Sequence, residues 1–94
     1  MFKDLNPLLH SQLRLAVISF LTSKGEPAGF NELKEITKAT SGNLSVQLKK
    51  LEGTGYVTIK KGFLSNYPHT TVEITTAGIE AFEQYVKALK GYIE

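Results

Sequence analysis

The sequence predicts a mainly α-helical domain with one β-hairpin, in the order helix, helix, helix, strand, strand, helix. Four segments carry apolar residues at three- and four-residue spacing, which is the period of an amphipathic helix. Two shorter segments between the third and the fourth alternate apolar and polar residues, as a half-buried strand does. The chain has 94 residues, of which 41% are hydrophobic and 21% charged, so we expect residues 1–94 to form a single globular domain.

The first helix is predicted over about Pro7–Lys24. Asn6 can cap its free amides, and Pro7 needs no N–H at the first helical position. Its core-facing stripe comprises Leu9, Leu13, Ala16, Val17, Phe20 and Leu21. Three further apolar residues lie off this stripe, namely Leu8, Leu15 and Ile18. A small monomer does not need so much apolar surface on one helix, so we expect these three in a dimer interface; the alternative is that both stripes pack within one subunit.

The second and third helices are predicted to be short and joined by a tight turn. A turn rich in glycine and proline over residues 25–29 ends the first helix. The second helix is marked by Phe30, Leu33 and Ile36. After a connection over residues 39–42, Thr40 or Ser41 can cap a third helix over about 41–53. The buried stripe of this helix comprises Leu44, Leu48 and Leu51.

A hairpin and a last helix complete the chain. Residues 56–60 and 71–74 are predicted to be strands, joined by a long loop that contains Gly62, Asn66 and Pro68. Thr75 or Thr76 then caps the last helix. Five apolar residues of this helix repeat at heptad-like spacing and form what we call the C-terminal seam: Ile79, Phe82, Val86, Leu89 and Ile93. We expect the seam in a dimer interface, with Tyr85 and Tyr92 at its edges.

This order of elements is that of a helix-turn-helix with a wing. The runs Phe30–Leu33, Gly42–Glu52 and Gly55–Val57 resemble the small winged-helix transcriptional regulators of the MarR-like and ArsR-like kind. The later run Ile74–Gly78 is similar to the strand end and helix start that follow their wing. The resemblance implies a winged helix-turn-helix fold with a C-terminal dimerisation helix, and a homodimer that binds double-stranded DNA sequence-specifically.

Charge is unevenly distributed along the chain. The formal net charge is +2, yet the segment from Thr40 to Thr71 carries four lysines against one glutamate. From Val72 to Glu94, four glutamates oppose two lysines. A basic central segment in a nearly neutral protein suggests a local binding surface for a polyanion. The alternative is that these lysines are merely solvated.

The third helix is the predicted DNA-reading element. With its leucines turned inward, the opposite face is small, polar and positive, as entry into a major groove requires. We expect the lysines to contact phosphate or guanine, Ser41 and Asn43 to anchor the helix start on phosphate, and Val46 and Gln47 to discriminate bases. The full set of expected contacts on this helix is Ser41, Asn43, Ser45, Val46, Gln47, Lys49 and Lys50.

The wing is predicted over about residues 60–70 and is expected to follow the DNA backbone or the minor groove. Its expected contacts are Lys60, Lys61, His69 and Thr70. The resemblance implies basic residues before and after the wing-tip proline, whereas this chain has Tyr67, Pro68 and His69. We therefore expect a weak or pH-sensitive wing contact, because histidine gains charge only near its ordinary pKa of about 6.5. The alternative is that the strand lysines and the histidine are simply solvated.

The residue content argues against several other functions. The chain has no cysteine and two histidines far apart in sequence, so no disulfide, thiolate metal site, metal centre or cofactor is expected. No nucleophile and base or carboxylate pair assembles, so we expect no enzyme. His10 is expected to be an ordinary polar position on the first helix. The longest apolar stretch is interrupted and too short for a membrane span, and no signal peptide is expected, which fits a cytoplasmic protein.

Two questions stay open in the sequence. A small-molecule effector is unknown; any ligand would enter a crevice between the first and last helices, lined by Phe20, Phe82, Tyr85 and Tyr92. The second question is the partner, because winged helices also serve as protein-docking modules without DNA binding. A steep salt dependence of binding would separate the two functions, since only phosphate contacts impose it.

Overall fold

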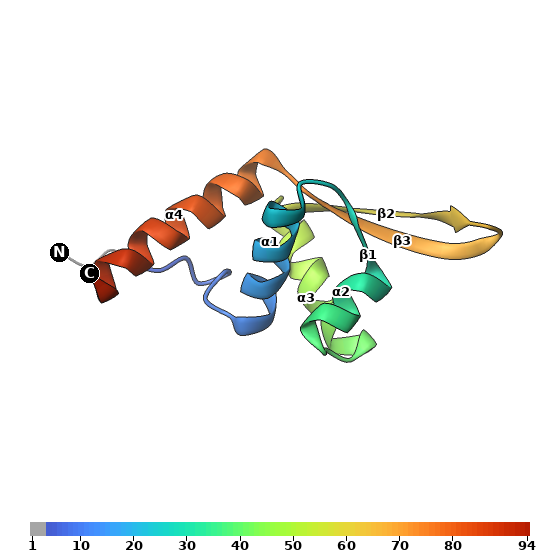
Figure 1. The fold of residues 1–94 in the computed structure, drawn as a ribbon, viewed down its shortest axis with the longest axis horizontal. Coiled ribbons are helices and arrows are strands. Elements are labelled where there is room, and N and C mark those ends of the chain that lie inside the picture. The colour runs from blue at the N-terminus through green and yellow to red at the C-terminus, as the bar shows by residue number, and fades with distance from the viewer. Residues whose placement is uncertain (1–3) are drawn as a thin grey trace.

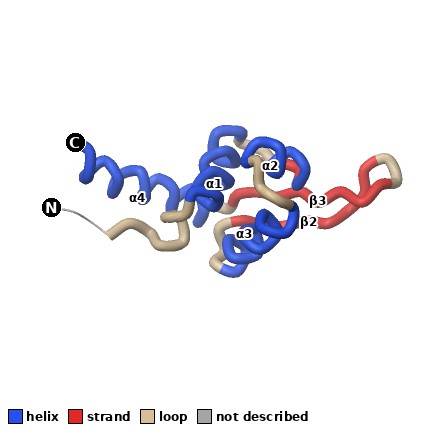
Figure 2. The backbone as a smooth tube through the Cα atoms, turned by 90° about the horizontal axis from the view of Figure 1, so that it is seen from below, coloured by secondary structure: helices blue, strands red, loops and turns tan. Residues whose placement is uncertain are grey.

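The computed structural model describes residues 4–94 as an elongated molecule of 53 × 25 × 21 Å (Figure 1). Three helices form the central body, while the hairpin projects from one end and the last helix from the other (Figures 1 and 2). This is the mainly α-helical winged fold with a C-terminal helix that the sequence predicts. The helices are α1 (Gln12–Lys24), α2 (Phe30–Thr37), α3 (Ser41–Gly53) and α4 (Thr76–Ile93); the strands are β1 (Ala28–Gly29), β2 (Val57–Leu64) and β3 (Tyr67–Ile74). Across residues 4–94, no helix combines the length and the apolar content that crossing a membrane requires.

Helix α1 begins at Gln12, so the prediction of a start at Pro7 is wrong. Asn6 does act as a cap, but of one isolated turn: its Oδ1 accepts a hydrogen bond from the amide of Leu8 at 2.9 Å. Its Nδ2 also donates to the hydroxyl of Tyr56 at 3.0 Å, which ties the turn to a distant part of the chain. These tertiary contacts redirect the backbone before Ser11, the residue that precedes α1. A local start signal is thus overridden by the packing of the N-terminal segment.

Helix α1 is the central helix of the molecule, in contact with α2, α3, α4 and β3. A helix with neighbours on several sides must be apolar around much of its circumference. Ile18, expected in a dimer interface, is therefore fully buried inside the single chain, and Leu8 and Leu15 pack half-buried against the same core. Leu15 and Ile18 of α1 thus pack in the core of one subunit, and the assignment to a dimer interface is wrong for Ile18.

The sheet has three antiparallel strands in the order β1-β3-β2. The first strand was not predicted: Ala28 and Gly29 pair with Val72 and Thr71 instead of forming only a turn. The predicted long loop of the hairpin is also wrong, because β2 and β3 stay paired out to Leu64 and Tyr67. Residues 65–66 alone make the turn, with φ of 50° and 69°. This positive φ at both turn positions matches the right-handed twist of the strands, so two residues suffice.

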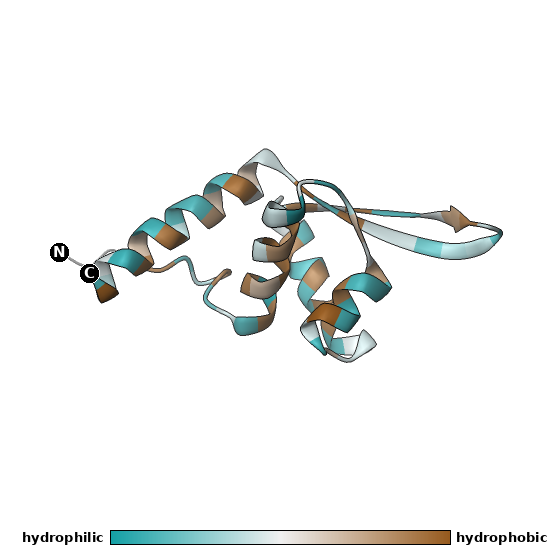
Figure 3. Cartoon of the chain, viewed as in Figure 1, coloured by the Kyte–Doolittle hydropathy of each residue, from teal (hydrophilic) through white to brown (hydrophobic). Residues whose placement is uncertain are grey.

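Helix α4 packs on the body through one face and leaves another exposed. Gly78, Tyr85 and Ala88 are its buried residues. The hydroxyl of Tyr85 lies 3.1 Å from Nδ1 of His10, at hydrogen-bonding distance. Tyr85 thus belongs to the intrachain core and not to the edge of a dimer interface. Apolar bands recur along α4 in Figure 3, and the C-terminal seam is rotated away from the buried face, with Ile79, Leu89 and Ile93 exposed.

An ion pair fixes the start of α2. The ammonium of Lys24 lies 2.7 Å from Oε1 of Glu32, and the same carboxylate accepts a hydrogen bond from the amide of Gly29 at 3.3 Å. The ammonium holds the pKa of the Glu32 carboxyl below its ordinary value of 4.5. A lowered pKa in the folded state means that the ionised form stabilises the fold above about pH 4.5, and that this stabilisation is lost as the pH falls through the folded-state pKa.

We therefore expect Glu32→Gln to lower the melting temperature at neutral pH and to matter progressively less as the pH falls to about 3. Thermal melts followed by circular dichroism over this pH range measure the effect. Glu35→Gln is the matched control, because Glu35 lies exposed on the same helix. A difference between Glu32→Gln and the wild type that persists undiminished in acid would show that the charge of Glu32 is not the cause.

Candidate nucleic-acid interface

Helix α3 presents the surface that its sequence predicts. Leu44, Leu48 and Leu51 are buried beneath it. On the opposite side Val46 is 50% exposed, and Lys49 and Lys50 are also exposed. The remaining predicted contacts at its start lie at the surface as well: Ser41 and Asn43 are exposed and Ser45 is half-buried. The bounds of α3, residues 41–53, are those predicted.

A three-residue turn sets the angle between α2 and α3. Lys38 ends α2 in the left-handed region, with φ of 61°. Thr40 then caps α3, its Oγ1 accepting a hydrogen bond from the amide of Asn43 at 3.1 Å. The cap occupies one of the free amides of α3 and fixes where the helix begins. The start of α3 with its small polar side chains is thereby held at the surface.

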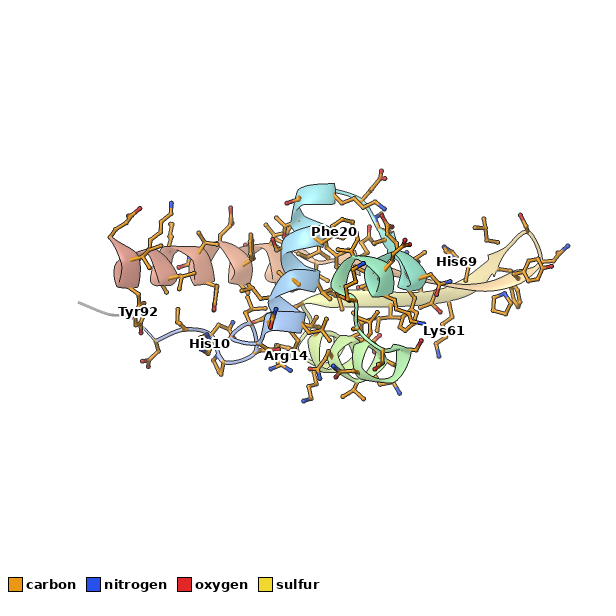
Figure 4. All side chains as sticks on the ribbon, turned by 60° about the horizontal axis from the view of Figure 1, so that its bottom comes forward. His10, Arg14, Phe20, Lys61, His69 and Tyr92 are labelled. Atoms are coloured by element: carbon orange, nitrogen blue, oxygen red, sulfur yellow. The ribbon has the colours of Figure 1, made fainter. Side chains whose placement is uncertain are left out.

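A hollow of about 260 Å³ separates α3 from the hairpin. Ser45 and Lys49 line it from α3, and Lys61 and Thr70 line it from the strands. Its apolar lining comprises Phe30, Leu48 and Ile59. Figure 4 shows Lys61 on the side of the hairpin that faces α3. The third helix and the wing therefore present one continuous surface that carries lysines on both walls.

The wing residues divide between the two faces of the hairpin. Alternate residues of a strand point to opposite faces, so Lys60 lies on the face opposite Lys61. His69 shares the face of Lys60 and lies against β1: its Cε1 is 3.2 Å from the position that a β-carbon on Gly29 would take. Figure 4 places His69 beside α2. Among the four predicted wing residues, only Lys61 and Thr70 share the hollow with α3.

The side chain of Gln47 is turned back to its own chain. Its Oε1 accepts a hydrogen bond from Nη1 of Arg14, and its Nε2 donates to Oδ1 of Asn43 at 3.0 Å. Arg14 also donates from Nε to the carbonyl of Leu8 at 2.6 Å. Sequence reasoning placed Gln47 among the base-reading residues, but in the structure both ends of its amide are engaged between α1 and α3.

Arg14 is a residue of the interface that sequence reasoning missed. It is the one arginine of the chain and it interrupts the apolar stretch of the first helix, which was the available signal. In the structure Arg14 extends from α1 (Figure 4) to Gln47, in the middle of α3. A guanidinium donates several hydrogen bonds in a fixed plane, so Arg14 joins the N-terminal turn, α1 and α3. It positions Gln47 and, through Gln47, the side chain of Asn43.

The candidate interface is positively charged. Within residues 4–94, the one ion pair joins Lys24 and Glu32, so the lysines at the hollow have no acidic partner in the part of the chain that the structure describes. The sequence has no acidic residue between Glu52 and Glu73. Unpaired lysines on a surface of one sign attract polyanions.

In residues 4–94, no three His, Cys, Asp or Glu side chains are grouped as a metal site would require.

A second cleft, of about 390 Å³, lies between the N-terminal segment and α4. Its lining comprises Asp4, Asn6, Tyr56, Ala81, Gln84, Tyr85 and Ala88. Of the four aromatic residues expected to line an effector crevice, Tyr85 alone borders this cleft. Phe20 and Phe82 instead pack half-buried against the core. The expected crevice between the first and last helices is therefore displaced toward the N-terminal segment, because that segment lies alongside α4 (Figure 2).

Comparisons with known proteins agree with this architecture. A family model described as winged helix DNA-binding domain matches residues 13–93. An uncharacterized protein of Methanocaldococcus jannaschii is 37% identical over 79 residues, which cover 84% of this chain and 85% of the relative. The structure of a transcriptional regulator homologue from Pyrococcus horikoshii has a TM-score of 0.85 at 31% identity, over 94% of this chain and 86% of that chain. A MarR-family transcriptional regulator from Silicibacter pomeroyi shares the fold, with a TM-score of 0.71 at 18% identity over 90% of this chain and 56% of its own.

Proposed function

Since the chain belongs to the family of winged-helix DNA-binding domains, we propose that it is a transcriptional regulator that binds double-stranded DNA sequence-specifically as a homodimer. The observation that carries the proposal is the continuous surface of α3 and the wing, with Lys49 and Lys61 on the two walls of one hollow. Such a surface suits a duplex because the lysines can neutralise phosphates on both sides of a helix that enters the major groove.

Helix α3 is the proposed reader of the major groove. Val46 lies at the middle of its exposed face, where an apolar side chain can contact a thymine methyl group. Asn43 stands at the exposed start of the helix and can donate and accept hydrogen bonds at a base edge. Lys49 and Lys50 supply phosphate or guanine contacts, and Ser41 and Ser45 supply phosphate contacts. Gln47 positions Asn43 instead of reading a base itself, because Arg14 and Asn43 already engage its amide.

The dimer is proposed to form through α4. This helix projects from the body away from the hairpin (Figure 1), and its C-terminal seam leaves Ile79 and Leu89 exposed by 37% and 36%. An apolar seam at heptad spacing is suited to a second copy of the same helix across a two-fold axis. The half-buried seam residues Phe82 and Val86 flank the exposed ones. Pairing through α4 leaves both copies of α3 free to occupy successive major grooves.

A salt titration of DNA binding tests the function. The probe is a duplex selected from a random library by the wild-type protein, and its affinity is measured by fluorescence anisotropy between about 50 and about 200 mM salt. We expect Lys49→Ala and Lys61→Ala each to weaken binding severalfold and to flatten the salt slope by about one unit, because each removes the charge that neutralises one phosphate. Lys60→Ala is the matched control, since Lys60 lies on the other face of the same strand, and we expect a smaller change from it.

The competing function is a protein-docking module without DNA binding. Exposed apolar side chains such as Val46 on α3 and Ile36 on α2 would favour it. Failure of the wild-type protein to retain any duplex from the library, at low or at high salt, would support this alternative and contradict ours. The cytoplasmic location and the single-domain organisation expected from the sequence stay predictions, and an effector stays unknown.

A further inference from the structure

The tip of the hairpin is apolar and almost fully exposed. Phe63, Leu64 and Tyr67 are exposed by 78%, 61% and 75%. Figure 3 shows the end of β2 coloured as hydrophobic while the neighbouring turn is not. Aromatic side chains left in water at the end of an arm that projects from the body are typical of an interaction surface. Lysine contacts on phosphate, the ordinary task of a basic wing, do not account for them.

The arm that carries these side chains is an ordered ladder. The strands pair continuously from Val57 opposite Ile74 to Leu64 opposite Tyr67. A turn of two residues closes the ladder, with both residues in the left-handed region that such turns require. The side chains at the tip therefore have a fixed direction relative to the body, which allows the two faces to be distinguished.

Phe63 lies on the same face of the hairpin as Lys61, because the two residues are separated by one position on β2. Its cross-strand partner is Pro68, and that of Lys61 is Thr70. This face is therefore the one that continues from the hollow beside α3. Leu64 and its partner Tyr67 point to the opposite face. Phe63, unlike Leu64, extends the proposed DNA-binding surface beyond its last lysine.

The arm carries Phe63 well beyond the hollow beside α3. From Ile59, in the hollow, to Phe63 the strand takes four steps of about 3.3 Å, about 13 Å in all. The arm therefore extends the surface of α3 beyond the hollow, in the direction in which the minor groove next to an occupied major groove would lie. The chain has no acidic residue between Glu52 and Glu73 to repel the backbone there.

We propose that Phe63 is an apolar wedge that enters the minor groove, partly unstacks a base step and bends the bound DNA. The proposal rests on the proposed function, because it requires α3 to occupy the adjacent major groove. Minor-groove wedges of this chemistry kink a duplex by about 20–90° toward the major groove. The partner is double-stranded DNA with a flexible base step at the tip. Pro68, directly across from Phe63, widens the apolar surface that replaces base stacking.

The experiment measures the bend of the library-selected duplex, labelled at both ends for fluorescence energy transfer, with wild type and three variants. We expect wild type to bend it, Phe63→Ala to abolish most of the bend and weaken binding about tenfold, and Phe63→Leu to retain most of both. Leu64→Ala, a truncation at the same tip on the other face, is the matched control and should behave as wild type. The salt slope of Phe63→Ala should equal that of wild type, since no phosphate contact is removed.

Two results would overturn the wedge. The first is that Phe63→Ala bends and binds the duplex as wild type does. The second is that Phe63→Ala and Leu64→Ala lose bending and affinity equally, which would show that the face of the hairpin does not matter. Sedimentation without DNA tests the alternative that the tip binds a second copy of this chain. A loss of self-association in Phe63→Ala would support that alternative and contradict the wedge. If wild type retains no duplex at all, the proposed function fails first; if it binds with a steep salt dependence while Phe63→Ala is indistinguishable from it, only the wedge fails.

Discussion

Replacing Leu89 by Glu is expected to convert the protein from a dimer into a monomer and to weaken its binding to a duplex with two half-sites about hundredfold or more. Leu89 is the fourth of the five residues of the C-terminal seam and is exposed in the single chain, so the new carboxylate costs the monomer little. In the proposed dimer it would be buried against the apolar seam of the second copy without a partner, which strongly destabilises an interface. The loss of affinity follows because each half-site would then be bound independently.

Sedimentation equilibrium and anisotropy on the selected duplex measure the two effects. Gln84→Glu is the matched control, since it adds the same charge to α4 on the side away from the seam. We expect this variant to remain dimeric and to bind as wild type. A Leu89→Glu protein that still sediments as a dimer, or a wild type that sediments at 10.4 kDa at micromolar concentration, would contradict an interface through α4.

Gly78→Ala is expected to destabilise the fold by about 1–3 kcal/mol. A β-carbon at Gly78 would lie 2.3 Å from the carbonyl oxygen of Tyr56 and 2.9 Å from Cγ1 of Ile74. The first of these is a backbone atom, which also accepts the amide of Thr75 at 3.0 Å and therefore cannot move away cheaply. Alanine stabilises a helix relative to glycine by about 1 kcal/mol. The expected loss of stability is therefore the cost of the steric clash minus this gain in helix propensity.

Urea denaturation of both proteins measures the change in the free energy of unfolding. Gly91→Ala is the control on the same helix, because a β-carbon there meets nothing within 4 Å. That substitution should be neutral or mildly stabilising, as helix propensity alone predicts. If Gly78→Ala were as stable as Gly91→Ala, the close approach of α4 to the backbone of Tyr56 would not be a constraint on the fold.

Local signals in the sequence determined several features of this protein. The leucines of α3 and the cap at Thr40 fixed a helix over residues 41–53 and the identity of its exposed face, because side-chain period and capping act within one segment. The same reasoning predicted α2, the presence of a hairpin and the last helix. These features depend on residues close together in the chain, and the structure confirms that these elements exist, although the two strands extend further than predicted. The roles on DNA and in a dimer stay predictions.

Only the tertiary structure decided the features that depend on distant residues. Helix α1 starts late because Asn6 binds Tyr56, and Ile18 faces the core because α1 has neighbours on several sides. The amide of Gln47 is engaged within the chain because Arg14, 33 positions earlier, reaches it. The two strands of the hairpin stay paired out to residue 64. This pairing depends on partners in the other strand, so the apolar pattern of one strand does not predict it. Periodicity tells which side of an element is apolar, but what covers that side, and which polar group meets which, is set by how the elements pack.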